Sequence, residues 1–70
     1  MDIYVTAERG RLELSEEYFK VSGIETRVFH DNPTKGIDTF KFTGNLNPAE
    51  LYQVLTSNGY SIIHETIILN

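Results

Sequence analysis

The amino-acid sequence predicts an α+β fold in which one helix packs on a face of an antiparallel sheet. Residues 46–60 combine a helix start, an apolar stripe at helical spacing and a helix stop. The segments on both sides alternate apolar with polar residues or are rich in β-branched residues, and turn formers separate them. We therefore expect an antiparallel β-meander of about five short strands, one helix at about 47–58 and a C-terminal strand at about 61–69 that returns into the sheet.

The start of the helix is marked by several independent signals. Asn47 is a preferred N-cap residue, because its side-chain oxygen accepts a hydrogen bond from an unpaired backbone N–H of the first turn. Pro48 follows at the first helical position, where its missing N–H is no loss. Glu50 places negative charge near the positive end of the helix dipole. Leu46 and Leu51 occupy the two positions of a hydrophobic staple, so the helix is expected to begin within a residue of Asn47.

The apolar face and the end of the helix are also visible in the sequence. Leu51, Val54 and Leu55 fall on one stripe at helical spacing. Gly59 suits the left-handed residue that ends many helices, and Tyr60 can then pack back on Leu55. A helix of this length is marginal alone in water, so it must lie on the apolar face of the strands.

The N-terminal residues predict a strand, since apolar and polar residues alternate from Ile3 to Ala7. The turn that follows at 8–10 contains Gly10, which can take a positive φ. A short second strand is expected at 11–14, where two leucines alternate with charged residues.

Residues 15–23 are compatible with two structures. The spacing of Leu14, Tyr18 and Val21 suits a short helix. The alternation of Phe19 and Val21 with polar residues, followed by a tight-turn dipeptide, favours a strand instead.

A hairpin is predicted in the middle of the chain. A return strand is expected at 24–30, a loop of turn formers at 31–36 and a further strand at 38–43. In this last strand Phe40 and Phe42 share one face, and polar residues occupy the other.

The C-terminal strand at 61–69 is apolar on both faces, with Ile62 and Ile68 on one face and Ile63 and Ile67 on the other. Such a strand is usually covered on both sides. The helix covers one side. Two alternatives remain for the other: a tightly curled sheet with this strand at its centre, or a second copy of the protein. The small size of the chain favours a homodimer.

Composition limits the class of protein. Seventy residues make one domain, residues 1–70. The absence of cysteine excludes disulfides and thiolate metal sites, and it fits a reducing compartment. With no signal peptide and no long apolar run in the sequence, we expect a cytoplasmic protein that does not contact a membrane. The net charge of -4 argues against a large phosphate-binding surface.

Residues suited to chemistry are sparse. His30-Asp31 and His64-Glu65 would bind a metal only if the strands brought them together, because neighbouring residues on a strand point to opposite faces. No serine lies in a nucleophile-elbow context, and the five glycines occur singly at turns. We therefore expect neither enzymatic activity nor a cofactor.

Aromatic residues interleaved with bases are expected on the sheet face away from the helix. This pattern suits a platform for single-stranded nucleic acid, and it equally suits a protein contact or a dimer interface. The acidic balance of the chain favours a protein partner. We expect a small non-enzymatic binding protein that acts through a sheet face or edge, with a single-stranded nucleic-acid module as the alternative. The candidate partner-binding residues are Tyr4, Tyr18, Lys20, Arg27, Phe29 and Lys41.

Overall fold

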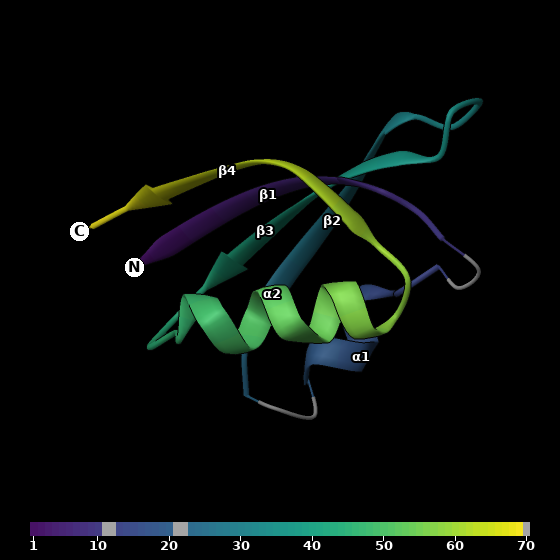
Figure 1. The fold of residues 1–70 in the computed structure, drawn as a ribbon. Helices are drawn as coiled ribbons and strands as arrows, with labels where there is room; N and C mark the ends of the chain where they lie inside the picture. The colour runs from purple at the N-terminus through teal and green to yellow at the C-terminus, as the bar shows by residue number, and fades with distance from the viewer. Residues whose placement is uncertain (11–12, 21–22, 70) are drawn as a thin grey trace.

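The computed structural model describes residues 1–10, 13–20 and 23–69, which form four strands and two helices (Figure 1). In chain order these are β1 (Asp2–Glu8), α1 (Glu16–Lys20), β2 (Glu25–Asn32), β3 (Ile37–Thr43), α2 (Pro48–Ser57) and β4 (Ser61–Ile68). The strands form one open antiparallel sheet in the order β2-β3-β1-β4. Both helices lie on the same face of this sheet, which confirms the predicted α+β class (Figure 1).

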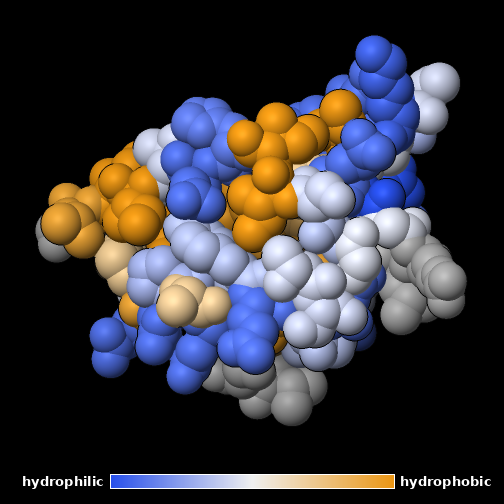
Figure 2. Space-filling model, in the orientation of Figure 1, coloured by the Kyte–Doolittle hydropathy of each residue, from blue (hydrophilic) through white to orange (hydrophobic). Residues whose placement is uncertain are grey.

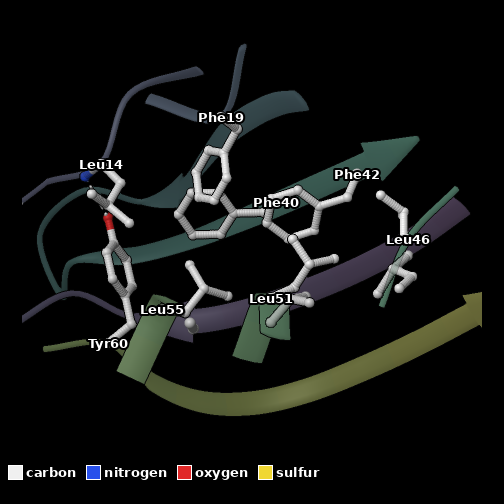
Figure 3. Close-up of a cluster of buried hydrophobic side chains, with 11 residues drawn as sticks. Leu14, Phe19, Phe40, Phe42, Leu46, Leu51, Leu55 and Tyr60 are labelled. Atoms are coloured by element: carbon white, nitrogen blue, oxygen red, sulfur yellow. Dashed lines mark hydrogen bonds between the residues drawn. The ribbon is translucent and has the colours of Figure 1, made fainter. Parts of the chain in front are cut away.

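The hydrophobic core lies between the sheet and the two helices. The rings of Phe40 and Phe42 from β3 stack with their centroids 5.7 Å apart. Phe19 from α1 meets both rings edge-on, at 6.0 and 5.0 Å. Figure 3 shows the leucines of α2 on the other side of these rings. The buried apolar residues are Ile3, Val5, Ala7, Leu14, Phe19, Phe40, Phe42, Leu46, Leu51, Leu55 and Tyr60.

Helix α2 has the boundaries that its sequence predicts. The Asn47 side chain accepts a hydrogen bond from the Ala49 N–H at 3.1 Å. At the other end the Tyr60 N–H donates to the Leu55 carbonyl at 3.0 Å, with Gly59 between them at a φ of 91°. These contacts satisfy backbone groups that a helix end leaves unpaired. After Gly59, β4 runs back along α2, antiparallel to it (Figure 1).

The N-cap bond gives a first testable prediction. Asn47→Ala is expected to lower the free energy of unfolding by about 1 kcal/mol, because the Ala49 N–H loses its acceptor. Urea denaturation measures the change, and an unchanged midpoint would contradict the assigned helix start.

The strand favoured for residues 15–23 is wrong, because Glu16–Lys20 form α1; residues 21 and 22 lie outside the described part of the chain. Two contacts between distant segments stabilise the helix. Phe19 packs on the rings of β3, and the Glu16 carboxylate accepts the Val28 N–H at 3.0 Å. The alternation of apolar and polar residues within 15–23 gives no sign of either contact, because both involve distant strands.

The strand expected at 11–14 is also absent where the structure describes it, at residues 13 and 14. Leu14 is instead buried, and its N–H donates to the Tyr60 hydroxyl at 3.1 Å (Figure 3). Gly10 has no positive φ; a Cβ at this position would overlap the Gly59 backbone, so close approach requires the glycine. Strand β1 pairs with β3 and β4 and therefore lies inside the sheet.

Strand β4 lies at one edge of the sheet, so the central position considered for it is wrong. A register shift between Thr6 and Ala7 leaves Ile63 unpaired and interrupts the alternation. Ile62, opposite Ala7, therefore lies on the helix side, whereas Ile68 lies on the other face. The sequence had placed these two isoleucines on the same face.

Candidate interaction surface

The open face of the sheet is the face away from both helices (Figure 1). The register places its side chains in rows that cross the strands. One row runs Arg27, Lys41, Tyr4 and Thr66 from β2 to β4. The adjacent row runs Phe29, Thr39, Thr6 and His64. The alternation that buries one face of each strand thus aligns a defined set of side chains on the other face.

Four of the six residues predicted for partner binding come together in these two rows. We call Tyr4, Arg27, Phe29 and Lys41 the open-face cluster. The other two predicted residues, Tyr18 and Lys20, lie on α1, on the opposite side of the sheet. Their placement with the cluster is wrong because it assumed a strand in this segment. The binding role of the four remains a prediction.

Polar contacts fix the centre of the open face. The Lys41 ammonium lies 5.7 Å from the centroid of the Tyr4 ring, within the range of a cation–π contact. The Thr6 and Thr39 hydroxyl oxygens lie 3.0 Å apart, and the Thr39 hydroxyl donates to Asp31. Because Thr39 has a single hydroxyl proton, Thr6 must donate to Thr39. These contacts hold the rows in place on three neighbouring strands.

The charges of the open face are unevenly distributed. Arg27 and Lys41 stand directly opposite each other across β2 and β3. Neither forms an ion pair with an acidic side chain in the described part of the chain. The acidic residues of this face lie outside the two rows, toward the ends of the strands, and are Asp2, Glu8, Glu25 and Asp31. The face therefore has a basic centre between acidic ends.

The structure also contains a polar cluster that sequence reasoning missed, centred on the fully buried Asp38. This carboxylate accepts a hydrogen bond from His30 Nδ1 at 2.8 Å and one from the Tyr60 hydroxyl at 3.3 Å. Arg9 Nε lies 3.2 Å away, at ion-pair distance without hydrogen-bond alignment. Burial, and then the Asp38 charge, raise the pKa of Tyr60, while its bond from Leu14 opposes the rise. The signal in the sequence is that Asp38 shares the inward-facing alternation of β3.

A histidine oriented by a buried carboxylate can act as a general base through its other nitrogen. Here His30 Nε2 lies 3.4 Å from a Glu13 carboxylate oxygen, and Glu13 also pairs with Arg9 at 3.2 Å. Both ring nitrogens of His30 thus face carboxylates, and these contacts form a network that joins β2, β3 and the segment after β1. His64 lies on the open face of β4, so the two histidines are not brought together. The described residues contain no group of three side chains suited to hold a metal ion.

A hollow of about 550 Å³ lies between α1 and α2, on the helix side of the sheet. Tyr18, Phe19, Leu51 and Val54 contribute to its largely apolar lining. Tyr18 is thus an exposed aromatic side chain that lies on α1, outside the open face.

Comparisons with protein-family models, curated proteins and solved structures find no match to this chain. Neither described helix has the length and apolar character needed to cross a membrane.

Proposed function

We propose that the protein is a small, acidic, non-enzymatic binding module that contacts another protein through the open-face cluster. The observation that carries this proposal is the juxtaposition of Arg27 and Lys41. Like charges directly opposite each other on neighbouring strands destabilise a sheet. The fold does not need this pair, and no described acid neutralises it. The two bases are therefore expected to meet negative charge on a partner.

The chemistry of the cluster defines the kind of partner that would fit. Phe29 is 47% exposed at one end of its row and offers an apolar contact. Tyr4 lies beside Lys41 and offers a ring next to a positive charge. Aromatic residues and arginine dominate the binding energy of many protein interfaces. The matching surface presents a carboxylate toward the two bases and an apolar side chain toward Phe29.

The acidic ends of the face favour a protein over a nucleic acid. A bound nucleic-acid strand carries a phosphate at every nucleotide, and binding strength depends on the number of phosphates neutralised. Only two bases occupy the centre of the face, and four carboxylates flank them. A protein partner can place one carboxylate at the centre and avoid negative charge at the ends. Nucleic-acid binding remains the outcome against which the proposal is tested.

Phe29→Ala is expected to reduce partner capture at least tenfold, because the variant removes the most exposed aromatic ring of the cluster. Tyr18→Ala is the matched control: Tyr18 is 49% exposed, similar to Phe29, but lies on α1. Immobilised wild-type protein and both variants are incubated with a nuclease-treated lysate of the producing cells. Bound proteins are then quantified by mass spectrometry.

Lys41→Glu provides an independent variant, because it reverses a central charge and leaves Phe29 in place. We expect the same captured protein to be lost with this variant and with Phe29→Ala, but retained by Tyr18→Ala. Equal capture by all four proteins, or no capture by wild type, would contradict the proposal. In a parallel sample without nuclease, capture that depends steeply on salt and is absent from the nuclease-treated lysate would identify a nucleic-acid binder instead.

A further inference from the structure

The outer edge of β4 is the second unusual surface of the molecule. This strand of eight residues carries one formal charge, at Glu65, and neither a lysine nor a proline. Ile67 and Ile68 are 46% and 45% exposed. Figure 2 shows hydrophobic side chains in two patches along the course of β4, with hydrophilic side chains between them. Natural sheets usually protect an edge of this kind with lysine, proline or a covering segment.

The opposite edge of the sheet, formed by β2, is protected. Its solvent-facing residues include Glu25, Arg27 and Asp31. The Val28 N–H is already occupied by the Glu16 carboxylate of α1, at 3.0 Å. No comparable side-chain bond reaches β4 from the residues that the structure describes. The two edges thus differ in their capacity to accept another strand.

The two faces of β4 show which strand would fit its edge. Ile67, opposite Ile3, lies on the helix side, and Ile68, opposite Asp2, lies on the open face. A strand that joins this edge must therefore offer apolar side chains on both of its faces, because cross-strand neighbours share a face. Strand β4 itself meets this requirement.

We infer that β4 pairs antiparallel with β4 of a second copy, joining two sheets into one about a two-fold axis. The pairing is self-complementary, since an outward N–H of one copy donates to an outward C=O of the other, and the two-fold axis repeats each bond in the reverse direction. An axis at Glu65 would place two carboxylates opposite each other, and the register shift disturbs the strand near Ile63. An axis at Thr66 would place Ile67 opposite Glu65 and Ile68 opposite His64, so the axis is expected at Ile67, where two isoleucines meet.

This interface is separate from the open-face cluster, so it goes beyond the proposed function and does not depend on it. One strand pair buries less than the roughly 800 Å² per partner of a standard interface. Dissociation constants of about 1–100 micromolar are therefore expected.

The test combines the mass of the assembly with its geometry. Sedimentation equilibrium of wild type is expected to show two chains per particle at high micromolar concentration. Ile67→Lys is expected to weaken association at least tenfold by placing a charge at the edge. Phe29→Ala, on the open face, is expected to remain dimeric.

The chain has no cysteine, so single-cysteine variants report directly on the pairing. Opposed residues of antiparallel strands have Cα atoms about 4.5–5.5 Å apart, which permits a disulfide. Ile67→Cys is expected to cross-link on oxidation, and Phe29→Cys, in β2, is not. A mass of one chain at about 200 micromolar would overturn the inference. A dimer that survives Ile67→Lys, with no cross-link at position 67, would equally overturn it.

Discussion

Phe40→Ala is expected to lower the free energy of unfolding by about 3–5 kcal/mol, close to the whole stability of a domain of this size. Phe40 is fully buried in β3. Its ring contacts Phe19, Phe42 and Tyr60, with centroid separations of 6.0, 5.7 and 5.2 Å. Alanine would leave a cavity where α1, β3 and the end of α2 meet.

Circular dichroism and urea denaturation measure this loss, and the variant is expected to be largely unfolded without denaturant. Phe29→Ala is the control, because it removes the same ring from an exposed position of the adjacent strand. It should change the free energy of unfolding by less than about 1 kcal/mol. A Phe40 variant as stable as the Phe29 variant would refute the assignment of the core.

Asp38→Ala is expected to lower the free energy of unfolding by about 2–3 kcal/mol. The substitution leaves His30 and the Tyr60 hydroxyl without an acceptor and Arg9 without its buried partner. Breaking a fully buried ion pair usually costs about 3–5 kcal/mol. The Arg9 and His30 side chains are 21% and 48% exposed, so water can hydrate both and reduce the loss.

Two further variants separate charge from shape at this position. Asp38→Asn retains an acceptor for Tyr60 but removes the charge beside Arg9, so an intermediate loss is expected. Glu8→Ala, an exposed acid on β1, is expected to change stability by less than about 0.5 kcal/mol. Equal urea midpoints for Asp38→Ala and Glu8→Ala would show that the buried network does not stabilise the fold.

The elements predicted correctly are those whose signals are local. Helix α2 carries its N-cap at Asn47 and its stop at Gly59 within its own sequence. Helix α1 was the less favoured of two alternatives, because contacts of Phe19 and Glu16 with distant strands stabilise its five helical residues. The faces of β4 were misassigned because a register shift at Ile63 interrupts strict alternation.

The same distinction holds for the candidate surfaces. Strict alternation within β1, β2 and β3 was enough to place Tyr4, Arg27, Phe29 and Lys41 on one face. The network around Asp38 joins residues that are far apart in the chain, so only the fold brings them together.

The central claim is that another protein contacts the open-face cluster. The most direct test is photo-cross-linking in the producing cells, with a photoreactive phenylalanine analogue at position 29 or at position 18. The proposal predicts a discrete adduct with another protein from position 29 and none from position 18. Adducts from position 18 alone, or no adduct from position 29, would contradict the claim and direct attention to the helix side of the sheet.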